Sequence, residues 1–288
     1  MPIHAAIIGV HKCGTSALLE MFRRHPRASV HFTGQAPPFL HEEDPAAAFE
    51  RIRAECFDDG DPAKRIVLRD TRLYLEPRML AELHALSPGA HLILAVRDPV
   101  SRAYSAFRFA QSKGVEVREE FRAVIAAQEE GPYDRQVHPI CNYVRMGQYY
   151  RNLKDIETVF PRSHIHVVRA DQLKDDANRT FRQICEFIGL DPIDMASTIV
   201  NETRQARSER FAQFLRREGA AKRLFRAVLP LRARMGMKSL VARLNATGER
   251  PPQMDRVDAE RLREIFRPDS ERLLAEYGVD VMRDWPGT

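Results

Sequence analysis

A short apolar run, a small polar turn and a helical pattern follow one another in residues 5–22, and this stretch constrains the fold most. The run predicts a buried strand, and after the turn apolar residues recur at helical spacing. Thr15 or Ser16 is expected to cap the helix, and Pro26 to end it. A strand, a glycine-containing turn and a helix N-terminus direct N–H groups and the helix dipole at one point. The stretch therefore predicts an anion-binding cradle, to which Lys12 adds a positive charge.

The glycines of this turn fit neither of two common nucleotide-binding loops. The nucleoside-triphosphate loop requires Gly-x-x-x-x-Gly-Lys-Ser/Thr. Gly9 and Gly14 have the required gap, but Thr15 stands where the lysine belongs, and Lys12 comes before the second glycine. The dinucleotide fingerprint requires a third glycine and a shorter first gap. A tight turn without a ligand is therefore the alternative to a phosphate site.

The chain alternates apolar strand patterns with helical patterns after this first unit. Strands are expected at 65–69, 91–96 and 165–168, with a short extended piece at 29–32. Helices are expected at 45–56, from Pro77, from Pro99 onward as charged helical sequence to about 130, at 147–160 and at 181–188. This alternation predicts an α/β fold: a P-loop-like parallel sheet with helices on both faces, followed by a helical, basic C-terminal part.

Three polar residues come directly after expected strands. Lys12, Asp70 and Arg97 each follow such a strand, and ligands of parallel sheets bind beyond the carboxyl ends of the strands. One crevice is therefore expected to collect all three side chains. Arg97 and Ser105, about two turns along the next helix, can hold a second phosphate. The alternative is that Arg97 pairs with Asp98 and that Ser105 only packs in its helix.

Composition and charge narrow the class of protein. The chain has 288 residues and 44% hydrophobic residues, enough for one large domain, or for a domain with an appendage. Its four cysteines are scattered without metal-ligand spacing, which predicts reduced thiols and a cytoplasmic location. We also expect no signal peptide and no membrane-spanning segment. Cys13 is expected to fill the tight turn rather than act as a nucleophile, because no His-Asp or His-Asn partner set is evident.

A strongly basic stretch follows the expected sheet. Residues 204–250 contain thirteen Lys or Arg and three Glu, a net charge of about +10, so the rest of the chain carries about −5. Within 204–244, Pro230 divides an apolar and basic pattern into two expected helices. The stretch is either a helical lid with a basic outer face or a surface for an anionic acceptor or a membrane. No nucleic-acid-binding motif is recognisable, so nucleic acid is not an expected partner.

Residues 7–26 (IIGVHKCGTSALLEMFRRHP) and 92–107 (LILAVRDPVSRAYSAF) resemble the two nucleotide-binding segments of sulfotransferases. The likeness is strongest to the heparan-sulfate type and its bacterial relatives, which use 3′-phosphoadenosine 5′-phosphosulfate (PAPS). It extends to residues 143–153, to 160–168 and to 261–285, and so covers most of the chain. The resemblance implies a core over 1–200 and a helical part over 201–288 that packs on the core and completes the cofactor site.

The resemblance also implies roles for individual residues. The 5′-phosphosulfate would be held by the turn, with Lys12, Cys13, Gly14, Thr15 and Ser16. Arg97 and Ser105 would hold the 3′-phosphate, and Gly248 and Arg250 would close a basic loop over the cofactor. Sulfuryl transfer depends on positioning and charge stabilisation, so Lys12 is also a catalytic candidate. No metal is expected, and the product would be 3′,5′-adenosine bisphosphate.

The general base is the weakest part of the resemblance. Heparan-type relatives use a glutamate just before an aromatic pair, which this sequence lacks near Val30, and Arg69-Asp70 replaces their Glu-Lys pair. The candidates are Asp70, whose alternative is an ion pair with Arg69 or Arg72, and His31, whose alternative is a solvated loop histidine. Glu42 and Glu43 are further possibilities on a loop.

The acceptor would be a hydroxyl or amine of a small molecule, a glycan or a lipid-linked compound. Two other classes of function remain open at the level of sequence. The first is a nucleoside-triphosphate-dependent kinase of the P-loop type. The displaced lysine and the lack of an evident acidic magnesium ligand after a strand argue against it. The second is a non-catalytic module that binds polyanions or membranes, which the missing glutamate favours.

Overall fold

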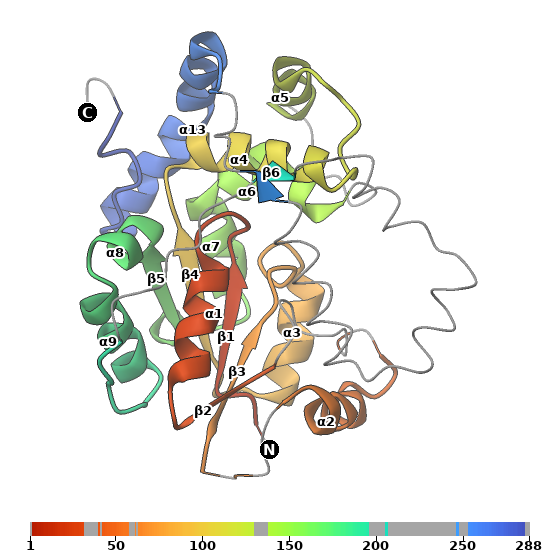
Figure 1. Cartoon of the computed structure of the whole chain (residues 1–288), viewed down its shortest axis with the longest axis vertical. Helices are drawn as coiled ribbons and strands as arrows, with labels where there is room; N and C mark the ends of the chain where they lie inside the picture. The colour runs from red at the N-terminus through yellow and green to blue at the C-terminus, as the bar shows by residue number, and fades with distance from the viewer. Residues whose placement is uncertain are drawn as a thin grey trace.

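The computed structural model describes residues 2–31, 40, 42–57, 61, 63–129, 138–195, 205–206, 246–247 and 253–285. Within them, five strands form a sheet in the order β2-β3-β1-β4-β5, and every neighbouring pair is parallel (Figure 1). The strands are β1 (Ala5–Gly9), β2 (Ala28–Val30), β3 (Arg65–Arg69), β4 (His91–Val96) and β5 (Ile165–Arg169). Because β1 lies between β3 and β4, the turn after β1 opens at the centre of the sheet.

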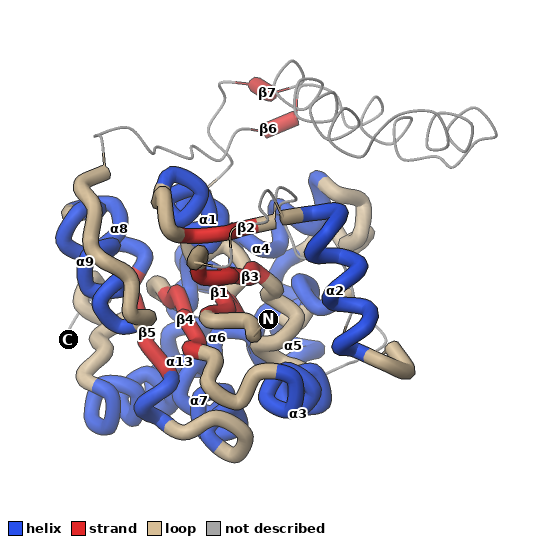
Figure 2. The backbone as a smooth tube through the Cα atoms, turned by 90° about the horizontal axis from the view of Figure 1, so that it is seen from below, coloured by secondary structure: helices blue, strands red, loops and turns tan. Residues whose placement is uncertain are grey.

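Helices cover both faces of the sheet. Figure 2 shows α1 (Thr15–Arg24) and α9 (Ala177–Phe187) on one face, and α3 (Pro77–Leu86) and α7 (Tyr149–Glu157) on the other. Since parallel crossovers are right-handed, a chain that moves from β1 toward one edge and then returns past β1 to β4 puts its helices on opposite faces. The predicted α/β fold with a parallel sheet is confirmed.

The structure describes further elements outside this sheet. They are α2 (Pro45–Cys56), α4 (Pro99–Ser112), α5 (Phe121–Glu129), η1 (Pro139–Cys141), α6 (Tyr143–Gly147), η2 (Arg162–His164), α8 (Ala170–Asp175), the antiparallel pair β6 (Gln205–Ala206) and β7 (Ala246–Thr247), and α13 (Arg256–Tyr277).

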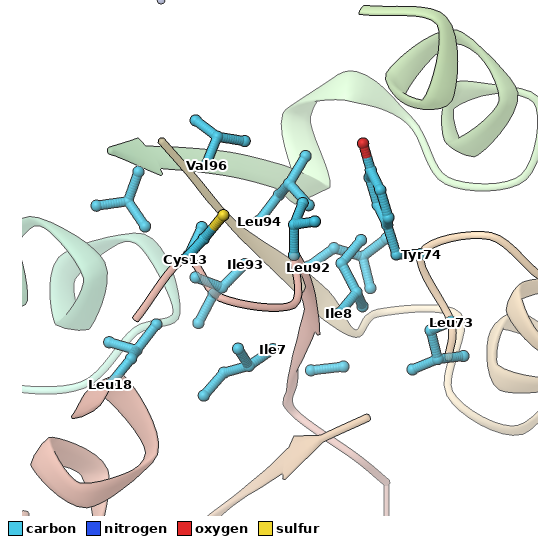
Figure 3. Packing of buried hydrophobic residues seen from close by; sticks show 14 of the residues in the cluster. Ile7, Ile8, Cys13, Leu18, Leu73, Tyr74, Leu92, Ile93, Leu94 and Val96 are labelled. Atoms are coloured by element: carbon cyan, nitrogen blue, oxygen red, sulfur yellow. The ribbon is translucent and has the colours of Figure 1, made fainter. Parts of the chain in front are cut away.

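The core is densest around β1 and β4. Ile7, Ile8 and residues 92–94 are completely buried, and Figure 3 shows their side chains packed with Tyr74 and Cys13. A Cβ atom on Gly9 would lie 3.0 Å from the Cβ of Tyr74, so only glycine lets β1 end this close to the segment after β3. The close approach fixes where the turn after β1 begins.

Several predicted helix bounds differ from the structure, and the helix expected at 147–160 is α7, Tyr149–Glu157. The charged helix expected to run from Pro99 to about 130 is two helices, because Gly114 adopts φ of 63° just after α4 ends. The helix expected at 181–188 begins four residues earlier, where the Asp176 side chain accepts a 2.9 Å hydrogen bond from the Arg179 N–H.

The last helix, α13, packs on α4, α5, α6 and α7. Of the described helices, none combines the length and apolar character that a membrane span requires. Most of residues 196–252 lie outside the described part of the chain, including the helices expected around Pro230. The division into parts 1–200 and 201–288 therefore stays a prediction.

Candidate active site

The turn between β1 and α1 has a defined backbone. Val10 N–H donates a 2.7 Å hydrogen bond to β4, while Lys12 has φ of 72° and Gly14 has φ of 81°. The left-handed region is uncommon for a residue other than glycine, so the surrounding structure holds Lys12 there. Gly14 is the N-cap of α1, and no side chain of the described residues caps this helix, so the expected capping by Thr15 or Ser16 is wrong. The first N–H groups of α1 have no intrahelical acceptor, as an anion site requires.

Lys12 is surrounded by an aromatic ring and two cations. Its Nζ lies 4.4 Å from the ring centroid of Phe109 on α4, and the Nζ of Lys113 lies 5.2 Å from the same centroid. Burial, followed by the charge of Arg97 and then that of Lys113, lowers the pKa of Lys12 to about 8. An anion that binds here would therefore strongly stabilise the charged form of Lys12.

Arg97 connects the second motif to the first. Its Nη1 donates to the main-chain oxygen of Lys12 at 3.4 Å, and its Nη2 donates to Ser101 Oγ at 2.7 Å. Ser105, the predicted partner of Arg97, lies half-buried one turn beyond Ser101 on α4. The structure thus brings the Arg97 side chain against the main chain of Lys12, in line with their positions after β4 and β1.

Thr15 and Arg69 link the cradle to β3. The buried Thr15 hydroxyl accepts a 3.0 Å hydrogen bond from Arg69 Nε. Burial lowers the pKa of Arg69 to about 10, and the charge of Arg23 acts in the same direction against the opposing effect of Asp70. Arg69 remains cationic at neutral pH, so it adds a third positive charge to the end of the sheet that holds Lys12 and Arg97.

The other turn residues differ in exposure. Gly14 and Ser16 are exposed at the start of α1, whereas Cys13 is completely buried. The Cys13 sulfur lies 3.9 Å from the hydroxyl of Tyr149, and burial raises the pKa of its thiol to about 11. A buried thiol with a raised pKa is a poor nucleophile, and Cys13 acts as a space-filling residue beneath the turn.

Both base candidates are buried and hydrogen-bonded. Asp70 is 1% exposed, and its carboxylate accepts hydrogen bonds from the main-chain N–H and the guanidinium of Arg72. His31, expected in a loop, is 0% exposed, and its Nε2 accepts the N–H of Arg69 at 3.0 Å. The ring of His31 packs edge-on against Phe57, with centroids 5.8 Å apart. The assignment of the base stays a prediction.

A further imidazole lies in the turn itself. His11 Nε2 is 2.9 Å from Thr71 Oγ1, which joins the turn after β1 to the segment after β3. Burial and the charge of Arg69 lower the pKa of His11 to about 3. The ring is therefore neutral at physiological pH and serves as a hydrogen-bonding group.

The remaining predicted residues lie apart from the turn or outside the described part of the chain. Glu42 and Glu43 are exposed in the segment before α2, whereas Gly248, Arg250 and most of the basic stretch lie outside the described residues. Asp98, next to Arg97, caps α4 by accepting from the N–H groups of Val100 and Ser101, and it accepts a 2.9 Å hydrogen bond from Trp285 Nε1. The C-terminal segment thus contacts the second motif at the residue that follows Arg97.

Sequence reasoning missed Arg69, His11 and Phe109 as members of the site. Arg69 ends a predicted strand and is followed by Asp70, and His11 precedes Lys12. Both are therefore sequence neighbours of residues that were predicted for the site, and this was the available signal. Phe109 gave no such signal, because an aromatic residue at helical spacing is indistinguishable from a core residue until α4 is placed beside the turn.

Residues 2–228 match the family described as the sulfotransferase domain. Human heparan sulfate glucosamine 3-O-sulfotransferase 6 is 32% identical over 189 residues, which are 65% of this chain and 52% of that protein. Human heparan sulfate glucosamine 3-O-sulfotransferase 3A1 is 27% identical over 286 residues, 98% of this chain and 62% of that protein. The chain thus spans between half and two thirds of the length of these relatives.

A sulfotransferase from Alicyclobacillus acidocaldarius has a similar solved structure, with a TM-score of 0.67, 20% identity and 98% of each chain covered. This similarity concerns the fold, and it extends beyond the residues that the family match covers. Arg97 contacts the turn after β1, and the match over residues 2–228 shows that the chain belongs to the sulfotransferase family.

Proposed function

We propose that this chain transfers a sulfuryl group from PAPS to a hydroxyl group of a glycan. The observation that supports this most is the hydrogen bond from Arg97 to the main-chain oxygen of Lys12. This hydrogen bond joins the second motif to the backbone of the first, an arrangement in which Lys12 and Arg97 could hold the two anionic ends of a single nucleotide. The curated relatives carry the name of heparan sulfate 3-O-sulfotransferases, which favours a glycan over other acceptors.

The residues present fit the donor at both ends. The left-handed backbone at Lys12 and Gly14 and the uncapped N-terminus of α1 suit the 5′-phosphosulfate. Arg97 and Ser105 suit the 3′-phosphate, with Arg97 already oriented by Ser101. When bound, PAPS would supply the sulfuryl group, and its 5′-phosphate would carry the negative charge that develops as the bisphosphate leaves.

The proposed transfer balances without a redox partner. A bond forms between the acceptor oxygen and sulfur, the bond between sulfur and the bridging oxygen of the 5′-phosphate breaks, and the acceptor proton passes to a base. Lys12 stabilises the charge on the departing phosphate, an interaction that is strongest in the transition state. Arg69, bonded to Thr15, adds positive charge at the same end of the sheet.

Asp70 and His31 remain the proposed bases. For Asp70, the guanidinium of Arg72 would have to release the carboxylate before the carboxylate accepts a proton. For His31, Nε2 is engaged by the Arg69 N–H, so a proton would need to reach this nitrogen after that hydrogen bond opens. Each candidate therefore requires a local rearrangement when the acceptor binds.

The basic stretch 204–250, with its net charge of about +10, is the proposed surface for an anionic glycan. The alternative partner for the basic residues of 204–244 is an anionic lipid surface, which offers the same negative charge. A cytoplasmic location remains a prediction from the scattered cysteines, of which Cys13, Cys141 and Cys185 are buried free thiols.

The test is transfer of radiolabelled sulfate from PAPS to a panel of acceptors that includes desulfated heparin-type chains, in the presence of a chelator. We expect labelled glycan from the wild-type protein and a loss of about 100-fold or more in kcat/KM for Lys12→Ala. Lys154→Ala, which removes an exposed lysine on α7, is the matched control and is expected to keep full activity. Transfer of phosphate from ATP with magnesium, and none of sulfate, would instead assign the chain to the kinases.

A further inference from the structure

Arg102 is a completely buried cation on α4, with an exposed fraction of 0%. Its Nη2 donates to the main-chain oxygen of Tyr143, while its Nε and Nη1 have no hydrogen-bond partner among the residues that the structure describes. Buried arginines are ordinarily paired with a carboxylate. Glu116, the buried acid that accepts from the Tyr143 hydroxyl, is already held by Arg118. Within the described residues, Arg102 therefore stands as a buried charge without an acidic partner.

Two structural connections link Arg102 to the anion cradle. Arg102 lies in the first turn of α4, and Arg97, which precedes the N-cap of that helix, donates to the main-chain oxygen of Lys12. The segment after Tyr143 leads to α7, where the Tyr149 hydroxyl lies 3.9 Å from the sulfur of Cys13. The charge of Arg102 also acts on the turn: it opposes the effect of burial on the pKa of the Cys13 thiol.

A buried cation without a partner destabilises a folded protein, because the charge has lost its hydration and has gained no opposite charge. An anion that binds above such a cation restores the missing charge in a region of low dielectric constant, where the attraction is strong. The same feature that weakens the ligand-free protein therefore strengthens the complex.

We propose that Arg102 supports binding of the sulfate donor electrostatically: it is an unpaired cation beneath the turn that raises affinity for the 5′ anionic group while lowering the stability of the ligand-free protein. The inference rests on the proposed function, since it needs an anion in the cradle. It differs from the roles of Lys12 and Arg97 because Arg102 is buried and acts through the field of its charge.

The experiment compares wild type, Arg102→Met and Arg102→Lys for thermal midpoint and for binding of 3′,5′-adenosine bisphosphate. Methionine fills much of the same volume without charge, so we expect the ligand-free midpoint to rise by about 2 °C or more. The dissociation constant for the bisphosphate is expected to rise about tenfold in the same variant. Arg102→Lys keeps the charge, and its affinity is expected to stay within about threefold of wild type.

Arg182→Met is the matched control, because it removes the same charge from the exposed face of α9, where Arg182 pairs with Asp194. We expect no change in affinity for this control. A merely structural role for Arg102 would lower the midpoint of Arg102→Met, and that result would overturn the inference, as would unchanged binding in a stable Arg102→Met protein. Failure of the wild-type protein to bind the bisphosphate would instead remove the proposed function, and this role of Arg102 with it.

Discussion

Lys12 combines a left-handed backbone conformation with an ammonium group against the ring of Phe109. The nearby charges of Arg97 and Lys113 add to the effect of burial and lower its pKa to about 8. An amine with this pKa is mostly protonated at neutral pH, yet it is easier to deprotonate than an exposed lysine. Its protonation state therefore becomes a measurable property of the proposed reaction.

We predict that kcat/KM for sulfate transfer falls as the pH rises through about 8, since the ammonium is the form that stabilises the departing phosphate. Lys113→Met removes a neighbouring positive charge, so the pKa of Lys12 should rise and the alkaline limb should move to higher pH. Rates measured between pH 6 and 10 test both statements. A limb that moves to lower pH in Lys113→Met would contradict this account of the Lys12 environment.

At the scale of residues, the sequence predicts the two cationic residues of the site better than it predicts the residues around them. Lys12 and Arg97 follow apolar runs that can only be central strands, so their place beside each other follows from the topology of parallel sheets. The burial of His31 against Phe57 was not predictable in this way. It depends on an antiparallel bridge between segments 26 residues apart, for which local patterns carry no signal.

At the scale of elements, the junction between α6 and α13 is unusually close. A Cβ atom built on Gly147, the last residue of α6, would lie 2.5 Å from the ring of Phe266 on α13. Phe266 is completely buried, so its ring has little room to move. Gly147 therefore sets the distance at which the C-terminal helix packs on the core.

We predict that Gly147→Ala lowers the free energy of unfolding by about 1–3 kcal/mol, the usual range for overpacking a well-packed core. Gly89→Ala is the matched control, because a Cβ at Gly89 meets no atom within 4 Å, and it should change stability by about 0.5 kcal/mol or less. Adding Phe266→Leu to Gly147→Ala should recover part of the loss. Denaturant unfolding measures all three, and equal stability of the two alanine variants would contradict the packing argument.

At the scale of the whole molecule, the periodic part of the chain was predictable and the irregular part was not. Strands β3 and β4 have the bounds that their apolar runs predict, because central parallel strands are buried on both faces. The break between α4 and α5 depends on the left-handed conformation of Gly114, which a charged helical pattern conceals. The contact of Trp285 with Asp98 joins residues 187 positions apart, and only the folded chain reveals it.

The central claim is that the turn after β1 and the start of α4 hold opposite ends of one adenine nucleotide. The most direct test is calorimetric titration of wild type and Arg97→Met with 3′,5′-adenosine bisphosphate and with adenosine 5′-monophosphate. We predict that Arg97→Met weakens binding of the bisphosphate by about tenfold to 100-fold, because a charged hydrogen bond to the 3′-phosphate is lost. The affinity for the monophosphate, which has no 3′-phosphate, should stay within about threefold of wild type. Equal weakening of both ligands, or of neither, would contradict the claim.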